Sequence, residues 1–141
     1  MTLLVDTSVW SLALRRDQPP ECREVDALRI ALAGNQAVVT TGLILQELLQ
    51  GFTGARAAAA IIERFSALPF VLPDRQDHID AAQLRNRCRR SGVQLGTIDA
   101  LLAQLCVRHG LVLLTTDADF AAAAPHCALK LWGSGPPRGE R

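Results

Sequence analysis

The segment Leu3-Leu4-Val5-Asp6-Thr7-Ser8 joins a short apolar run to an acidic residue and two hydroxyl residues. The segment Leu111-Val112-Leu113-Leu114-Thr115-Thr116-Asp117 has the same layout near the other end of the chain. A short continuous apolar run is typical of a strand that is buried on both faces, and Asp, Ser or Thr after it is typical of a helix start. Both segments therefore predict a buried strand that ends near an acidic residue and passes into a helix.

The rest of the chain alternates short apolar runs with helical patterns. Further strands are expected at 37–39, 70–72 and 129–131, and helices at about 7–16, 21–33, 42–52, 55–66, 74–91, 97–109 and 118–123. Such alternation is typical of a parallel sheet that is covered by helices on both faces. We therefore expect a single-domain α/β/α sandwich with a central, mostly parallel sheet of about five strands. It would span residues 1–132, and residues 133–141 would form a mobile tail.

Composition excludes several classes of protein. The chain has 141 residues, 49% of them hydrophobic, and its 15 basic and 14 acidic residues give a net charge of +1. This length and apolar content suit one domain with its own core, and they disfavour disordered or coiled-coil chains. The near-zero charge excludes nucleic-acid binding through bulk charge alone. Because no apolar stretch approaches the roughly 20 residues of a membrane span and no signal peptide is visible, we expect a cytoplasmic protein with no membrane partner.

Four acidic residues occupy equivalent places in this pattern. Asp6 and Asp117 follow predicted strands, Glu47 lies in the helix after the second strand, and Asp99 lies in the first turn of the helix before the 111–114 strand. Ligands of open parallel sheets bind beyond the carboxyl ends of the strands. We therefore expect the four carboxylates to converge on one edge of the sheet.

Structural roles are the alternative for each acid alone. An Asp before a helix is a good cap, and an Asp in a first helical turn is favoured by the helix dipole. Glu47 is harder to explain in this way, because it lies at the margin of an apolar face with no basic residue within one turn. Four like charges in one cleft need a bound cation or raised pKa values. Oxygen ligands without His or Cys suit Mg²⁺ or Mn²⁺.

The acidic segments resemble the successive motifs of a known family. Leu-Leu-Val-Asp6-Thr-Ser-Val-Trp, Ile-Leu-Gln-Glu47-Leu-Leu-Gln-Gly, Thr-Ile-Asp99-Ala-Leu-Leu-Ala and Leu-Leu-Thr-Thr-Asp117-Ala-Asp-Phe are similar to the motifs of PIN-domain ribonucleases, most of all the VapC-type toxins of bacterial toxin–antitoxin pairs. The resemblance runs from residue 3 to about residue 131. It implies that Asp6, Glu47 and Asp99 are the core metal-binding acids and that Asp117 holds a metal directly or through water.

The resemblance also implies supporting residues at the acidic cleft. Thr7 and Thr116 match positions where small hydroxyls assist the site. Asp119 falls where some members carry a further acid, although an exposed helix start explains it as well.

The resemblance further implies an activity and partners. The activity would be that of an Mg²⁺-dependent endoribonuclease, with Mn²⁺ as an alternative and one or two ions bound, in which metal-activated water hydrolyses RNA phosphodiester bonds. The protein would be the toxin of a type II toxin–antitoxin system. Its partners would be the RNA substrate, a small VapB-type antitoxin and a second copy in a homodimer, with a higher toxin–antitoxin assembly beyond that.

A cluster of arginines precedes the third acidic motif. Arg85, Arg87, Arg89 and Arg90 lie near the end of the predicted 74–91 helix, a few residues before Asp99. They form either a solvated helix C-terminus, where cations are favoured, or a rim that contacts RNA phosphates. The sequence leaves both interpretations open.

Other functions remain as alternatives. A phosphoacceptor receiver domain would have adjacent acids after the first strand, whereas Asp6 stands alone. A haloacid-dehalogenase-type phosphatase would have an Asp two residues after Asp6, where this chain has Ser8. A catalytically silent or regulatory PIN-like module that binds RNA or protein is the stronger alternative, but the retention of all four acids favours the nuclease.

Overall fold

The computed structural model describes residues 1–15 and 22–134, and its centre is one parallel sheet. The strand order is β2-β1-β3-β4. The strands are β1 Thr2–Val5, β2 Ala37–Val39, β3 Val112–Leu114 and β4 Lys130–Leu131. Leu4 of β1 pairs with Val39 on one side and with Leu113 on the other. The sequence predicts these four strands to within one residue at each end.

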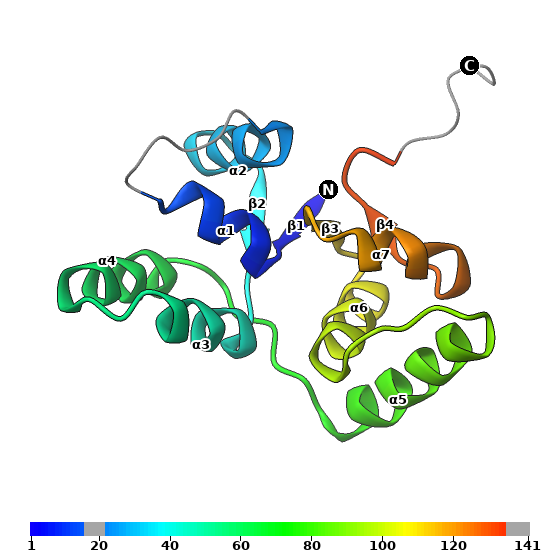
Figure 1. Cartoon of the computed structure of the whole chain (residues 1–141). Helices are drawn as coiled ribbons and strands as arrows, with labels where there is room; N and C mark the ends of the chain where they lie inside the picture. The colour runs from blue at the N-terminus through cyan, green and yellow to red at the C-terminus, as the bar shows by residue number, and fades with distance from the viewer. Residues whose placement is uncertain (16–21, 135–141) are drawn as a thin grey trace, which may run out of the picture.

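Helices flank the sheet in two groups, with α1–α4 on the left of Figure 1 and α5–α7 on its right. The α-helices of the described residues are α1 Thr7–Ala13, α2 Arg23–Ala33, α3 Gly42–Gly51, α4 Ala55–Ser66, α5 Arg75–Arg90, α6 Thr97–His109 and α7 Ala118–Ala123. A 3₁₀ turn, Ala124–His126, leads towards β4. All seven helices are predicted from the sequence, although α1 ends three residues earlier than expected. The architecture is the expected α/β fold with a central parallel sheet.

The predicted fifth strand at 70–72 is wrong. Phe70 makes a single parallel bridge with Thr40, just beyond the end of β2. Proline has no N–H to donate to a strand ladder, and Pro69 and Pro73 bracket this stretch. The carbonyl of Pro69 still accepts a hydrogen bond of 3.0 Å from the Thr40 N–H. The described sheet therefore has four strands, with one bridge where a fifth was expected.

The core is built around α6. Every residue from Ala100 to Cys106 is buried, as are Leu4, Leu113 and Leu114 of the neighbouring strands. Gly110 takes the left-handed conformation, with φ of 64°, and turns the chain from the end of α6 towards β3. Since α6 runs back along β3, its first turn lies near the carboxyl edge of the sheet.

Two predictions lie partly outside the described residues. The tail expected at 133–141 falls mostly on 135–141, and the predicted end of the first helix falls on Arg16. Within the ranges that are described, no helix is both long and apolar enough to cross a membrane.

Candidate active site

Asp6 is the most buried of the four acids, with 6% of its surface exposed. Its N–H donates to the Leu114 carbonyl at 2.9 Å, which carries the β1–β3 pairing one residue beyond the strand. Asp6 occupies the N-cap position of α1, but its side chain makes no capping hydrogen bond. The helix-cap explanation of Asp6 therefore fails, and its carboxylate faces other partners.

Two hydroxyl groups contact that carboxylate. Ser8 Oγ and Thr115 Oγ1 each donate to Asp6 Oδ2 at 2.8 Å. The predicted supporting hydroxyls were Thr7 and Thr116, whereas the hydroxyls that contact Asp6 belong to Ser8 and Thr115. The side chain of Thr116 is exposed, and its contribution is a backbone N–H that donates to Ser8 Oγ at 3.1 Å. The sequence shows a pair of hydroxyl residues near the end of each strand, but it does not predict which member of each pair faces the site.

Glu47 reaches the same region from α3, which begins beyond the carboxyl end of β2. Its side chain is half-buried, and Thr7 Oγ1 donates to Glu47 Oε1 at 3.0 Å. This hydrogen bond joins the first turn of α1 to the middle of α3. Thr7 therefore lies beside the predicted site, against a different acid from the one that Ser8 and Thr115 contact.

Asp99 shows that the acids act on one another. Partial burial, and then the charges of Asp6, Asp117, Glu47 and Asp119 in that order, together raise the pKa of its carboxyl to about 6. A like charge raises a carboxyl pKa in this way when it lies close and poorly screened. The structure therefore places the other three predicted acids within electrostatic reach of Asp99.

Asp117 has a structural role as well. It is the N-cap of α7, and its Oδ1 accepts the backbone N–H of Asp119 at 2.9 Å. Its own N–H donates to Thr115 Oγ1 at 3.0 Å. Asp119 is exposed, as its alternative interpretation as a helix-start residue requires.

The acids share a region without forming a preassembled metal cage. Among the described residues, no three Asp, Glu, His or Cys side chains lie close enough together to hold one metal ion. Coulomb repulsion acts over longer distances than coordination, so this result is compatible with the raised pKa of Asp99. Mg²⁺ keeps several waters and is usually bound by one or two carboxylates. The donor set, which is all oxygen, fits such a hydrated ion.

Among the described residues, no basic side chain forms an ion pair with any of these four acids. The ion pairs that the structure shows there join Arg108 to Asp74 and Asp77, away from the four acids. Burial and then the charge of Asp6 raise the pKa of the Cys106 thiol to about 12, so this buried thiol is a poor nucleophile. The three histidines, His78, His109 and His126, are exposed.

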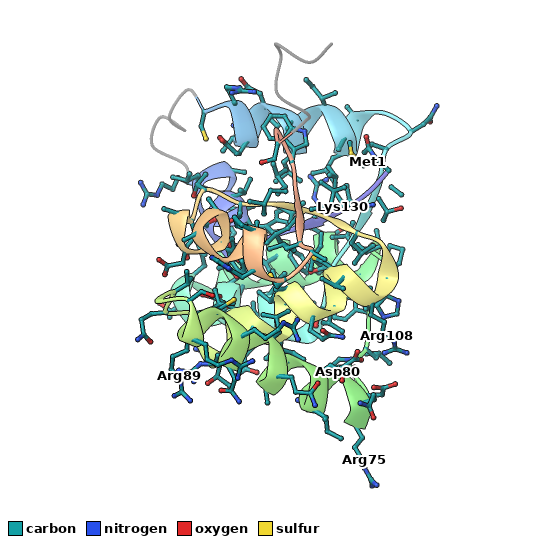
Figure 2. All side chains as sticks on the ribbon, turned by 90° about the vertical axis from the view of Figure 1, so that its right-hand side faces the viewer. Met1, Arg75, Asp80, Arg89, Arg108 and Lys130 are labelled. Atoms are coloured by element: carbon teal, nitrogen blue, oxygen red, sulfur yellow. The ribbon has the colours of Figure 1, made fainter. Side chains whose placement is uncertain are left out.

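The predicted arginine cluster divides into two parts. Arg85 is half-buried, and its Nε donates to the Leu95 carbonyl at 2.7 Å, which ties α5 to the loop before α6. Arg87, Arg89 and Arg90 are exposed in the last turn of α5. Figure 2 shows Arg89 on the outside of the molecule, far along α5 from Arg75. Arg85 therefore has a structural contact, and the other three arginines are free to meet an external partner.

Comparison with known proteins agrees with this architecture. Residues 3–125 match the family model of the PIN domain. The chain is 30% identical over 124 residues to ribonuclease VapC11 of Mycobacterium tuberculosis, a match that covers 86% of this chain and 91% of the relative.

Solved structures give the same fold. The crystal structure of VapBC2 from Rickettsia felis, bound to a promoter DNA fragment, matches with a TM-score of 0.72 and 18% identity over 93% of this chain and 97% of that chain. The crystal structure of FitAcB from Neisseria gonorrhoeae matches with a TM-score of 0.67 and 25% identity over 93% of this chain and 96% of that one. With nearly the whole chain matched by family model, relative and fold, the protein belongs to the PIN-domain family, with VapC ribonucleases among its relatives.

Proposed function

We propose that this chain is a metal-dependent endoribonuclease and the toxin of a type II toxin–antitoxin pair, acting in the cytoplasm. One observation carries the proposal. The charges of the other three acids raise the pKa of Asp99, and none of the four acids forms an ion pair with a basic side chain among the described residues. Membership of the PIN-domain family and the VapC relatives support the same conclusion.

Asp6, Glu47 and Asp99 would hold the metal, and Asp117 would contribute directly or through water. When bound, Mg²⁺ or Mn²⁺ supplies a water of lowered pKa and neutralises charge that develops on the phosphate. Because no three acids converge closely, we expect protein carboxylates to fill only part of the coordination shell and water or substrate oxygens to fill the rest.

The residues of the chain would bind and orient the RNA around this site. Hydrolysis joins the oxygen of water to phosphorus and breaks the bond to the 3′ oxygen, which leaves a 5′-phosphate and a 3′-hydroxyl. Asp99 must lose its proton to serve as a ligand, and it does so above its pKa of about 6. Arg87, Arg89 and Arg90 would contact the RNA backbone at the end of α5.

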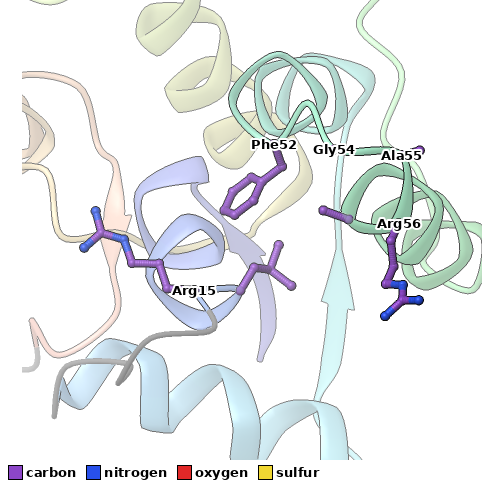
Figure 3. Close-up of a pocket in the computed structure, with 7 residues that line it drawn as sticks. Arg15, Phe52, Gly54, Ala55 and Arg56 are labelled. Carbon is purple, nitrogen blue, oxygen red and sulfur yellow. The ribbon is translucent and has the colours of Figure 1, made fainter.

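The antitoxin would meet a different surface. A pocket of about 750 Å³ lies between the end of α1 and the start of α4. Figure 3 shows the Phe52 ring between Arg15 and Arg56, and Leu14 also lines the pocket. Neither arginine forms an ion pair within the described ranges. Apolar walls with basic edges suit a peptide segment that has an apolar anchor and acidic neighbours.

A double variant separates this surface from the acidic site. Arg15→Glu with Arg56→Glu should weaken binding of the antitoxin at least tenfold and leave RNA cleavage by the free toxin unchanged. Unchanged antitoxin binding, measured by calorimetry, would remove the pocket from the proposed interface.

The homodimer needs its own surface. Ile98 of α6 is exposed, at 42%, and lines a cavity of about 340 Å³ between α3, α5 and α6. An exposed apolar side chain at the mouth of such a cavity is typical of protein contacts. We expect Ile98→Glu to shift the mass measured by light scattering from dimer to monomer. A wild-type monomer at every concentration would contradict the dimer.

Incubation with single-stranded RNA tests the nuclease proposal. The purified chain should cleave the RNA with Mg²⁺ or Mn²⁺, stop when a chelator is added and resume when the cation is restored. Glu47→Gln, which keeps the shape of the side chain, should be inactive in the same assay. Cleavage that survives both treatments would contradict the proposal, and RNA binding without cleavage by the wild type would favour the catalytically silent module.

A further inference from the structure

The most connected polar network of the molecule lies where Asp6 meets the loop after β3. Ser8 Oγ and Thr115 Oγ1 both donate to Asp6 Oδ2, and these two hydroxyl oxygens are 3.3 Å apart. Ser8 belongs to the first turn of α1, and Thr115 follows β3. The two hydroxyls therefore bring together segments that are 107 residues apart in the chain.

The backbone sets the direction of this network. The Thr116 N–H donates to Ser8 Oγ at 3.1 Å, and the Asp117 N–H donates to Thr115 Oγ1 at 3.0 Å. A hydroxyl has one hydrogen to donate, and here each hydroxyl oxygen already accepts from a backbone amide. An ionised carboxylate can only accept, so each O–H is donated to Asp6 Oδ2, and the donors run from backbone to hydroxyl to carboxylate. Such chains strengthen each hydrogen bond in them.

The network fixes one oxygen of Asp6 and leaves the other. Oδ2 accepts two O–H groups. Oδ1 accepts no hydrogen bond from a described residue, and it is not among the fully buried polar atoms that lack a partner. Because Asp6 is 6% exposed and its carboxylate is held at Oδ2, rotation of the carboxyl group is restricted. A further hydrogen bond, from the Asp117 N–H to Thr115 Oγ1, anchors the backbone of Asp117 to the same network.

A helix-capping explanation does not account for this arrangement. Asp6 stands at the N-cap position, yet its side chain makes no capping hydrogen bond. Asp117, in contrast, caps α7 through its own Oδ1. The two strand-end acids are thus used differently, and Asp6 is the one that the hydroxyls orient.

We propose that Ser8 and Thr115 are positioning residues of the cation site: they hold Asp6 so that Oδ1 alone is available to a metal ion, and they hold the loop that carries Asp117. This inference rests on the proposed metal-dependent function. Residues behind a metal ligand commonly change metal affinity 10- to 100-fold when they are replaced.

Mn²⁺ binding to the metal-free protein, followed by electron paramagnetic resonance without RNA, tests the inference. Thr115→Val keeps the shape of the side chain and removes the O–H, and we expect it to weaken Mn²⁺ binding about tenfold. Ser8→Ala should have an effect of similar size. Thr115→Ser restores the hydroxyl and should bind within about threefold of the wild type.

Thr40→Val is the matched control. Thr40 is fully buried, and its hydroxyl has no hydrogen-bond partner among the described residues. This variant should leave Mn²⁺ affinity unchanged, because it makes the same chemical substitution at a hydroxyl that makes no hydrogen bond to Asp6. Native-state hydrogen exchange provides a second measurement: the Asp117 amide should exchange faster in Thr115→Val, and the Thr116 amide in Ser8→Ala.

The outcomes separate this inference from the proposed function. A wild type that binds no Mn²⁺ and cleaves no RNA overturns both. A wild type that does both, with a folded Thr115→Val that binds Mn²⁺ equally well, overturns the positioning role alone. A loss of thermal stability in Ser8→Ala and Thr115→Val without a loss of Mn²⁺ affinity also overturns it, because the hydroxyls would then serve the fold only.

Discussion

Two groups of acidic residues in this molecule are compensated in opposite ways. At the start of α5, Asp74 and Asp77 accept each other's backbone N–H groups at 2.9 Å, which forms a capping box. Arg108, from the end of α6, pairs with both carboxylates. The Asp77 N–H and then Arg108 lower the pKa of Asp74. The charges of this group are therefore compensated by a basic side chain inside the chain, although Asp77 Oδ1 is buried without a hydrogen-bond partner among the described residues.

The acids at the carboxyl edge of the sheet have hydroxyl and backbone donors but no basic side chain among the described residues. There, burial and the neighbouring carboxylates raise the pKa of Asp99 to about 6. The first acidic group stabilises the fold. In the second group the carboxylates repel one another, and a cation from outside the chain would offset that repulsion. Substitutions in the two groups and in the arginines near them test this difference, and we expect the largest effect from the acids at the edge of the sheet.

Asp6→Asn should have the largest effect on activity. The amide keeps the shape of the side chain but removes a charge from the proposed metal site, so we expect kcat/KM for RNA cleavage to fall about 100-fold or more. Asp74→Asn is the matched control from the other group, because Asn also caps helices well and Asp74 lies outside the site. An Asp6→Asn variant with wild-type cleavage would contradict the distinction between the two groups.

Arg108→Ala should have the largest effect on stability. It leaves the Asp77 carboxylate, whose side chain is 1% exposed, without its cation. We expect a loss of about 2 kcal/mol in the free energy of unfolding, since Arg108 itself is 42% exposed and part of the pair is screened. Urea unfolding measures this change. Arg75→Ala, which removes an exposed arginine from the first turn of α5 beside Asp77, should change stability by less than about 0.5 kcal/mol; equal losses in both variants would contradict a special role for Arg108.

The metal-free protein should lose stability as the pH rises through the pKa of Asp99. Its carboxyl has a pKa of about 6 in the folded state, against 3.8 for the unperturbed group, so the folded state holds this proton more tightly. The resulting stabilisation is present in full below pH 3.8 and is lost as the pH rises past 6. Asp99→Asn cannot titrate, and its Tm should fall less over this interval. Added Mg²⁺ should raise the wild-type Tm more at pH 7.5 than at pH 5.

The reverse result would refute the electrostatic account of the site. If Asp99→Asn and wild type show parallel Tm curves between pH 4 and pH 7.5 without metal, the neighbouring acids do not raise the pKa of Asp99. The same scan with Asp74→Asn provides a reference of opposite sign. The pKa of Asp74 is lowered in the folded state, so this carboxylate adds stability above its unfolded pKa, and that stability is lost as the pH falls. The difference in Tm between wild type and Asp74→Asn should therefore shrink at acid pH.

The surface arginines should have the smallest effect. Arg89→Ala with Arg90→Ala should weaken RNA binding a few-fold and reduce the salt dependence of that binding. Arg85→Ala removes the hydrogen bond to Leu95 and should lower stability instead. An unchanged salt slope in the double variant would assign these arginines to the solvated end of α5.

Local sequence predicts most of this fold, because each buried strand is a continuous apolar run and each helix has a clear start or stop. The sequence also predicts that Asp6, Glu47, Asp99 and Asp117 meet, since a parallel sheet places strand ends and returning helix starts at one edge. The charges of the other three acids raise the pKa of Asp99, and the shared role of the four in a metal site stays a prediction.

Other features depend on contacts that local sequence does not encode. Whether Thr115 or Thr116 faces Asp6 depends on how the chain leaves β3, and Ser8 becomes relevant only when that loop is folded against α1. Arg85 looks like its neighbouring arginines in the sequence and differs from them only by its contact with Leu95. Pro69 and Pro73 did signal that 70–72 would pair poorly.

Titration of the metal-free protein with Mn²⁺, read by electron paramagnetic resonance at pH 7.5, tests the central distinction most directly. The wild type and Asp74→Asn should bind Mn²⁺ equally, whereas Asp6→Asn and Asp99→Asn should each lose most of that binding, because the uncompensated acids form the cation site. Equal Mn²⁺ binding by all four proteins, or a loss confined to Asp74→Asn, would contradict this account.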